Sequence, residues 1–170
     1  VTIDSATMMN KGLEMIEALH LFALDPAQLR VWVHPQSIVH SFVHFKDGAL
    51  LAQLAQPDMA LPIQYALTWP DRALHAPVPS MTLAQMQNLE FSEPDLSRFP
   101  CLKLVFDALP LGAWTHPILT LANEVAVKAF LAGRITADRI AAVIEQGLAR
   151  AETDFAAIVR HAEEDVARFA

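Results

Sequence analysis

The sequence has few cysteines, few basic residues and no long apolar run, and each shortage excludes a class of protein. Cys101 is the one cysteine among 170 residues, so no disulfide forms within the chain and a reducing compartment such as the cytoplasm suits it. No apolar run approaches the ~20 residues of a membrane-spanning helix. The net charge is −7 and the basic residues are scattered, which argues against nucleic acid as the main partner. A small phosphate ligand stays possible, because one or two cations and a few hydrogen-bond donors are enough to bind it.

The apolar fraction is high enough for a packed core. It reaches 54%, which excludes a disordered tail. The chain opens on Val1 with the strand-like stretch "VTID" rather than on methionine. We interpret this start as that of a fragment or of a processed chain, and expect a fragment.

Hydrophobic periodicity and turn residues predict an α+β fold, in which a mixed α/β part with a β-hairpin precedes an all-α bundle. The predicted divisions are residues 1–69, a linker at 70–95, and a helical domain at 96–170. The predicted elements are a helix at 5–22 with Ser5 or Thr7 as N-cap, a strand at 30–33, a hairpin of 37–45 and 49–55 turning at Gly48, a helix after Asp58 that ends at Trp69, a weak strand at 89–91, and helices at 101–109, 117–132, 137–150 and from 154 onward.

The first predicted helix groups polar side chains that suit an anion. At 100° per residue, Asn10, Lys11 and Glu14 fall on one arc, opposite the apolar face. With the hydroxyl of Ser5 near a helix N-terminus, they could bind a phosphate, and the Glu14 carboxylate could bind a divalent cation. The alternative is that Ser5 is a cap, and that Lys11 and Glu14 form an exposed ion pair three residues apart. Residue type alone favours the alternative.

The histidines offer a second candidate site. His34, His40 and His44 lie near the predicted hairpin, and three histidines on one sheet could bind zinc. Pro35 interrupts the register between the first of them and the others, so we expect His34 and His44 to be structural. Met59 stands at a loop-to-helix junction, where its soft side chain could lie against a flat ring.

The motifs "DSATMMNKGLE", "HPQSIVHSFVHFKDGALLAQLAQPDM" and "LANEVAVKAFL" resemble the 1-deoxy-D-xylulose 5-phosphate reductoisomerase family. The resemblance covers essentially the whole chain. It implies an oxidoreductase and isomerase of the non-mevalonate isoprenoid pathway. Such an enzyme converts 1-deoxy-D-xylulose 5-phosphate to 2-C-methyl-D-erythritol 4-phosphate with NADPH and magnesium, manganese or cobalt. It also implies a homodimer, and a first part of the chain that belongs to the catalytic domain.

The resemblance assigns roles to the residues of the opening motif. Glu14 matches a metal ligand, and Ser5 and Asn10 match phosphate-binding residues. Lys11 matches a residue that binds both the phosphate and a substrate hydroxyl. These implied roles agree with the chemistry of the side chains themselves.

Two further roles follow from the resemblance, together with some departures from the family pattern. Met59 matches a methionine near the nicotinamide, and His40 matches a histidine with a supporting role near the site. Thr120 and Leu121 stand where the family usually has Asn and Ala. The family's nucleotide-binding domain and its remaining metal carboxylates precede this segment. We therefore expect the parent protein to be the enzyme and this chain alone to be inactive; the alternative is a non-catalytic dimerisation or scaffold module.

Overall fold

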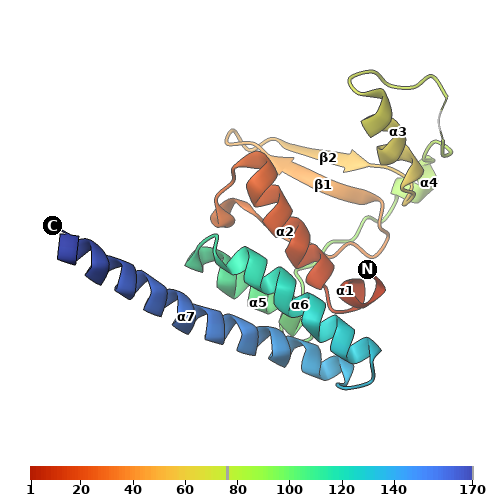
Figure 1. The fold of residues 1–170 in the computed structure, drawn as a ribbon. Coiled ribbons are helices and arrows are strands. Elements are labelled where there is room, and N and C mark those ends of the chain that lie inside the picture. The colour runs from red at the N-terminus through yellow and green to blue at the C-terminus, as the bar shows by residue number, and fades with distance from the viewer. Residues whose placement is uncertain (76, 170) are drawn as a thin grey trace. The chain divides into compact units, whose positions relative to one another are not determined.

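The computed structural model describes residues 1–75 and 77–169, with side chains up to Asp154, and it confirms the predicted α+β class (Figure 1). Within the described residues no helix is both long and apolar enough to cross a membrane. The elements are α1 (Thr2–Ala6), α2 (Met9–Phe22), the 3-10 turn η1 (Pro26–Gln28), β1 (Val39–His44), β2 (Leu50–Leu54), α3 (Ala60–Thr68), α4 (Leu83–Met86), α5 (Pro100–Ala108), η2 (Leu109–Leu111), α6 (Thr115–Leu131), η3 (Ala137–Arg139) and α7 (Ile140–Phe169).

The described chain forms two compact units whose boundaries differ from the predicted division. A helical unit joins Val1–Val31 to Asp95–Ala170, and a hairpin unit comprises Trp32–Pro94. The sequence placed the opening helix with the hairpin because the two are adjacent along the chain. In the structure the apolar face of α2 packs against α5, so this helix belongs to the helical unit.

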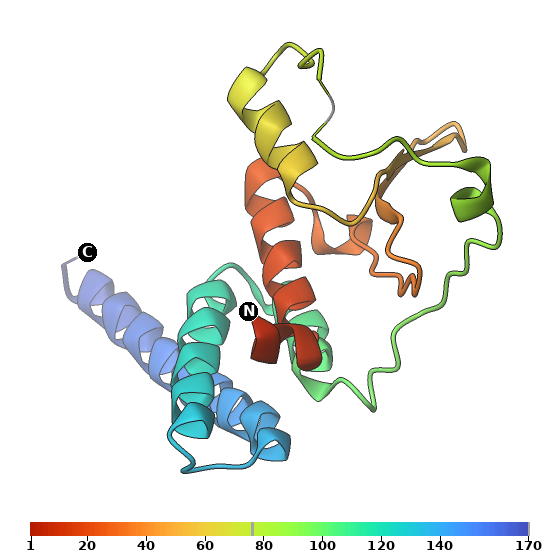
Figure 2. The ribbon, with the colours of Figure 1, turned by 90° about the vertical axis from the view of Figure 1, so that its right-hand side faces the viewer.

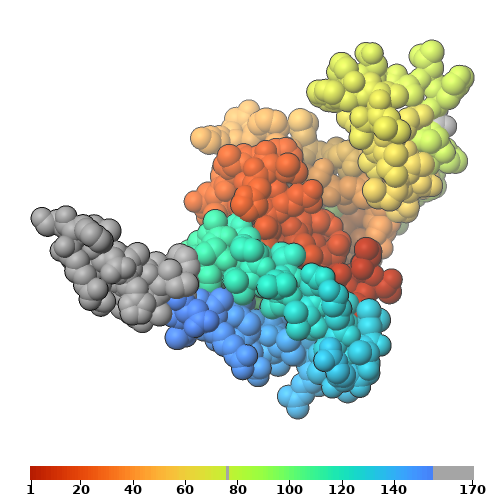
Figure 3. All heavy atoms as spheres, viewed as in Figure 1, coloured from red at the N-terminus to blue at the C-terminus, as the bar shows by residue number. Residues whose placement is uncertain are grey.

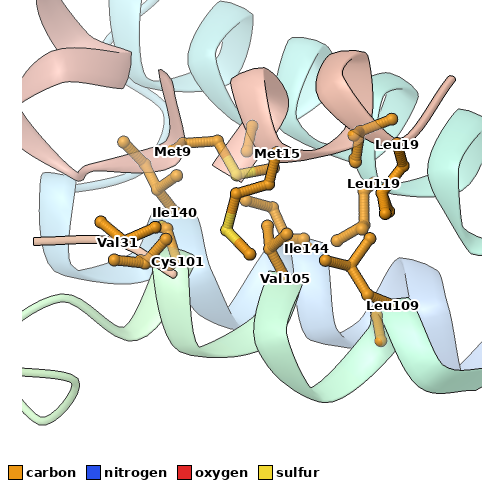
Figure 4. Packing of buried hydrophobic residues seen from close by; sticks show 14 residues of the cluster. Met9, Met15, Leu19, Val31, Cys101, Val105, Leu109, Leu119, Ile140 and Ile144 are labelled. Atoms are coloured by element: carbon orange, nitrogen blue, oxygen red, sulfur yellow. The ribbon is translucent and has the colours of Figure 1, made fainter. Parts of the chain in front are cut away.

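The core of the helical unit lies between α2, α5, α6 and α7 (Figure 4). Figure 2 shows α2 and α5 from a second side, and α6 and α7 side by side. Fully buried side chains come from each of these helices: Met9, Leu102, Val105, Leu119, Ile140 and Ile144. Burial of side chains of this size contributes roughly 1.5–3 kcal/mol each. This core fixes where the exposed face of α2 lies.

The beginning of the chain differs from the prediction. The stretch "VTID" is part of the short helix α1 and forms no strand. Met8 then adopts a left-handed conformation, with φ of 56°, so a corner separates α1 from α2. The predicted N-caps are therefore wrong: Ser5 lies inside α1, and Thr7 is the residue that ends it. Helix α2 begins at Met9, whose side chain is fully buried and holds the corner against the core.

The predicted hairpin is confirmed in the second unit. Strands β1 and β2 pair antiparallel, and Gly48 takes a positive φ of 93° in the turn. The carboxylate of Asp47 accepts a hydrogen bond of 2.9 Å from the Ala49 amide and closes the turn. A bulge lies between Val39 and Ser41, which interrupts the strict alternation of faces along β1.

The predicted strand at 30–33 is reduced to one residue. Val33 pairs with Ser92 through two backbone hydrogen bonds of 2.8 and 3.0 Å, and no longer ladder forms there. Pro35 lacks an amide hydrogen and follows two residues later, which limits the pairing. The helix after Asp58 is confirmed, because its carboxylate accepts a 2.8 Å hydrogen bond from the Ala60 amide at the start of α3.

The later helices follow the prediction except at one point. Helices α5 and α6 lie where they were expected, and α6 ends before Gly133, whose φ is 68°. The break predicted between Arg150 and Thr153 is wrong, because α7 is continuous. Thr153 does not cap a new helix there, since its hydroxyl donates a 3.0 Å hydrogen bond to the carbonyl of Ala149 within α7.

A pair of histidines joins α2 to the start of α6. His20 Nε2 and His116 Nδ1 are 2.9 Å apart, and the two rings meet edge to face (Figure 3 shows the atoms of α2 against those of α6). His116 is buried, and burial lowers its pKa from the ordinary value of 6.5, with a further lowering by His20. The buried imidazole is therefore neutral in the folded chain near neutral pH.

The lowered pKa of His116 predicts a loss of stability on acidification. The unfolded chain takes up this proton at a higher pH than the folded chain does. The free energy of unfolding is therefore highest above about pH 7, and it falls as the pH drops through the ordinary pKa of histidine. Denaturant titrations at about pH 7 and about pH 5 measure the difference. His116→Gln keeps a hydrogen-bond acceptor but does not titrate, and we expect a smaller pH dependence in it; an equal dependence in both proteins would refute this assignment.

Candidate functional site

Three side chains on the solvent side of α2 form a hydrogen-bonded group, which we call the polar arc: Asn10, Lys11 and Glu14. The Asn10 amide donates to Glu14 Oε1 at 2.7 Å, and the Lys11 ammonium donates to Glu14 Oε2 at 2.5 Å. The Lys11 and Glu14 side chains are 44% and 45% exposed. The structure thus brings together three of the residues that the sequence selected.

The position of the polar arc follows from the burial of the opposite face of α2. The buried residues of α2 are Met9, Gly12, Met15, Ile16 and Leu19. The residues of the polar arc lie between these along the sequence and therefore on the outward side of the helix. The ion pair that residue type alone favoured is present, but it leaves donors unused. An ammonium group has three N–H donors and a primary amide has two, so within the described part of the chain one contact each with Glu14 leaves two on Lys11 and one on Asn10.

Ser5 lies on α1, across the Met8 corner from the polar arc, and its side chain is exposed. Its two flanks are tied to the core. Before it, Asp4 Oδ1 accepts a 2.8 Å hydrogen bond from the Asn123 amide of α6. After it, the side chain of Met8 packs against the core, while the hydroxyl of Thr7 donates a 3.1 Å hydrogen bond to the carbonyl of Ile3 within α1. The short helix is thereby held on both sides of the serine.

Cys101 is a packed thiol in α5. Its side chain is 2% exposed. Burial raises its pKa; the hydrogen bond with Thr7 lowers it in part, and the negative charge of Asp4 raises it again. A buried thiol with a raised pKa is a poor nucleophile, because the thiolate is the reactive form.

The other two predicted site residues lie in the hairpin unit. His40 is exposed and stands at the bulge of β1. Met59 precedes α3 and is 68% exposed. Both side chains are therefore open to a ligand from outside the unit.

His34 was predicted to be structural, and the structure adds a detail that the sequence did not provide. Its ring stacks on Phe91 with 4.5 Å between centroids, and Nδ1 donates a 2.7 Å hydrogen bond to the carbonyl of Glu90. That bond leaves Nε2 as an acceptor, and this atom is buried with no partner among the described residues. His44 is exposed, so the prediction of a satisfied structural histidine is wrong there.

The donor set tests both metal hypotheses. Among the side chains that the structure describes, those of residues 1–75 and 77–154, no three from His, Cys, Asp or Glu lie close enough together to hold a metal ion. The histidine-based zinc hypothesis thus has no support in the described residues. Glu14 is an exposed carboxylate, a ligand type that suits magnesium or manganese, but it is a single ligand. A metal at Glu14 needs further ligands from outside the described residues.

The fold and the polar arc define the chain as an α+β protein with an amide, an ammonium and a carboxylate exposed at the start of one helix of its helical unit. Residues 54–168 match the family described as DXP reductoisomerase C-terminal domain. Residues 1–22 match the family described as 1-deoxy-D-xylulose 5-phosphate reductoisomerase C-terminal domain. The chain therefore belongs to the DXP reductoisomerase C-terminal domain family, which confirms the resemblance seen in the motifs.

Relatives and solved structures agree with this assignment. The 1-deoxy-D-xylulose 5-phosphate reductoisomerase of Moorella thermoacetica is 56% identical over 144 residues, which cover 85% of this chain and 37% of the relative. That of Ralstonia nicotianae is 53% identical over 150 residues, covering 88% and 38%. A crystal structure of DOX-P reductoisomerase in complex with NADPH, fosmidomycin and magnesium has 50% identity and a TM-score of 0.81, and covers 86% of this chain and 36% of that one.

A second solved structure is the reductoisomerase from Zymomonas mobilis in complex with NADPH. It has 43% identity and a TM-score of 0.81, and covers 87% of this chain and 39% of that one. The chain thus spans less than two fifths of the length of these relatives.

Proposed function

We propose that this chain forms part of a 1-deoxy-D-xylulose 5-phosphate reductoisomerase, and that its polar arc binds the substrate. The complete enzyme rearranges the carbon skeleton of 1-deoxy-D-xylulose 5-phosphate and reduces the resulting aldehyde with hydride from NADPH. The product is 2-C-methyl-D-erythritol 4-phosphate. The observation that carries the proposal is the hydrogen-bonded group of Asn10, Lys11 and Glu14 in a chain of this family.

In this proposal the substrate phosphate binds the unused donors near the corner of α1 and α2. Lys11 supplies positive charge and N–H donors, Asn10 supplies its remaining amide hydrogen, and Ser5 supplies a hydroxyl. Charge-assisted hydrogen bonds to a phosphate are roughly twice as strong as neutral ones. Lys11 also reaches a substrate hydroxyl in this arrangement.

Glu14 is proposed to be the one metal ligand that this chain supplies. A divalent cation, when bound, polarises the substrate carbonyl as a Lewis acid. Magnesium, manganese and cobalt all accept a carboxylate oxygen, and a related structure contains magnesium. Each oxygen of Glu14 accepts one hydrogen bond and keeps a lone pair for a cation. Asn10 and Lys11 orient the Glu14 carboxylate through these two hydrogen bonds.

The residues of the hairpin unit have supporting roles in the proposal. Met59 packs near the nicotinamide of NADPH, which its exposure permits, and His40 supports the site from β1. Two related structures contain NADPH. A homodimer in the cytoplasm belongs to the same proposal, and so does inactivity of the chain by itself.

Lys11→Ala tests the proposal. The test protein is a complete enzyme in which residues 1–170 replace the matching part of the Moorella thermoacetica reductoisomerase. Loss of a charge-assisted hydrogen bond of about 1.5–3 kcal/mol predicts a rise in the KM for 1-deoxy-D-xylulose 5-phosphate of roughly 10- to 100-fold. Steady-state oxidation of NADPH measures it.

Lys103→Ala is the matched control, because Lys103 is also an exposed helical lysine paired with an acidic residue one turn away, Asp107. We expect wild-type kinetics from this control. A Lys11→Ala enzyme with unchanged KM and kcat would contradict the proposal.

That contradictory outcome would favour the second candidate, a dimerisation or scaffold module. The observation in its favour is the hairpin, whose apolar side chains Val43, Leu50 and Leu51 are 48–61% exposed. A two-stranded sheet also leaves both outer edges without backbone partners in the described chain. Unchanged activity after Lys11→Ala, together with dissociation after Leu51→Lys, would support it.

A further inference from the structure

We propose that Asn123 of α6 is a positioning residue for the phosphate subsite, and this inference rests on the proposed function. Asn123 acts through Asp4 and touches neither the phosphate nor the metal. It fixes α1, and with it the hydroxyl of Ser5, relative to the polar arc on α2.

The first observation is a hydrogen bond between residues far apart along the chain. The Asn123 Nδ2 atom donates to Asp4 Oδ1 at 2.8 Å, and 119 positions separate the two residues. Asn123 is 5% exposed and the Asp4 side chain is 19% exposed, so little water competes for the bond. A carboxylate accepts but does not donate, which sets the orientation of the amide.

The second observation is that one atom of the Asn123 side chain lowers the stability of the folded chain. Asn123 Oδ1 is buried and has no partner among the described residues. An unsatisfied buried polar atom lowers stability, whereas an apolar side chain of similar size has no such atom. Stability alone therefore does not account for an amide at this position. Its specific contribution is the directed bond to Asp4.

The third observation is where that bond acts. Asp4 directly precedes Ser5 in α1, and Met8, three residues after Ser5, packs against the core. The left-handed Met8 then turns the chain into α2. Five-residue helices have little stability of their own, because helix nucleation is unfavourable. Without the Asn123 contact, only the apolar contacts of Ile3 and Met8 hold α1, and the position of the serine hydroxyl is less closely defined.

The test uses three variants of the complete chimeric enzyme: Asn123→Leu, Asn123→Asp, and the double exchange Asp4→Asn with Asn123→Asp. Inorganic phosphate is the probe, measured as a competitive inhibitor, alongside KM, kcat and the melting temperature. Asn123→Leu removes the orphaned oxygen but also leaves the Asp4 carboxylate without this donor, so the two effects on stability oppose each other and the melting temperature should change little. Loss of the fixed α1 should nevertheless raise the inhibition constant of phosphate and the KM about fivefold or more.

The exchange variants separate positioning from general damage. Asn123→Asp places two carboxylates together and should weaken phosphate binding at least as much. The double exchange restores an amide-to-carboxylate bond with its direction reversed, and phosphate binding should recover toward wild type. Glu124→Gln is the matched control, since Glu124 is the exposed neighbour of Asn123 on α6 and is paired with Lys128, and it should change nothing.

The outcomes also separate this inference from the function on which it rests. Wild-type phosphate inhibition in Asn123→Leu and Asn123→Asp, alongside weakened binding in Lys11→Ala, would overturn the positioning role and leave the proposed function intact. A double exchange that stays as weak as Asn123→Asp would also overturn it. If Lys11→Ala has no effect either, the phosphate subsite itself is wrongly placed and both proposals fail.

Discussion

Glu14→Gln is expected to lower the kcat of the complete enzyme by roughly 10²–10³-fold, because a neutral amide replaces the carboxylate proposed to bind the metal. The Gln side chain has the same length and its oxygen still accepts a hydrogen bond from Asn10 or Lys11, so the fold of α2 should persist. The manganese concentration needed for half-maximal rate should rise as well. Rate measurements over a series of manganese concentrations give both values.

Glu17→Gln is the control for this experiment. Glu17 is exposed on the same helix but outside the polar arc, so its loss of charge should leave both values near those of the wild type. An unchanged melting temperature in Glu14→Gln shows that the loss is chemical and not structural. Wild-type kcat in Glu14→Gln would contradict the metal assignment.

Gly12→Ala is expected to destabilise the helical unit, although alanine is the better helix former. A Cβ atom at Gly12 would lie 2.6 Å from Val105 Cγ2 and 3.1 Å from Val105 Cβ. Val105 is fully buried, so it has no room to move away. Overpacking of this kind costs about 1–3 kcal/mol and outweighs the roughly 1 kcal/mol gained in helix propensity. Denaturant unfolding of the isolated chain measures the net loss.

A second substitution tests the cause of that loss. Val105→Ala removes both Cγ atoms and opens a cavity, so it is destabilising by itself. Combined with Gly12→Ala, the new methyl group fills part of this space, and the double variant should be more stable than the two separate losses predict. Simple additivity of the two losses would show that the close approach of α2 to α5 is not what requires glycine at position 12.

Sequence periodicity located the buried face of α2 well. Gly12, Ile16 and Leu19 recur at helical spacing, and burial of that face is what turns Asn10, Lys11 and Glu14 outward. The local turn signals were similarly informative: Gly48 and Asp47 identify the hairpin without knowledge of the rest of the chain. In these places the helical periodicity and the turn residues agree with the packing, so this part of the fold and the polar arc were predictable.

The features that the sequence did not predict depend on distant contacts. The Met8 corner places a non-glycine residue at positive φ, a conformation that local preferences disfavour and that packing of its buried neighbour, Met9, supports. The hydrogen bond between Asp4 and Asn123 joins two motifs that were each noticed, but no pattern within either one shows that they meet. The helical unit combines Val1–Val31 with a segment that begins at Asp95, and this grouping also depends on contacts between residues far apart in the sequence.

Steady-state turnover of the chimeric enzyme with 1-deoxy-D-xylulose 5-phosphate, NADPH and manganese tests the central claim most directly. The account predicts that residues 1–170 support turnover with one NADPH oxidised for each 2-C-methyl-D-erythritol 4-phosphate formed, and that Lys11→Ala and Glu14→Gln impair it through KM and kcat respectively. A chimera that folds and binds NADPH, yet turns over nothing or is indifferent to both substitutions, would contradict it.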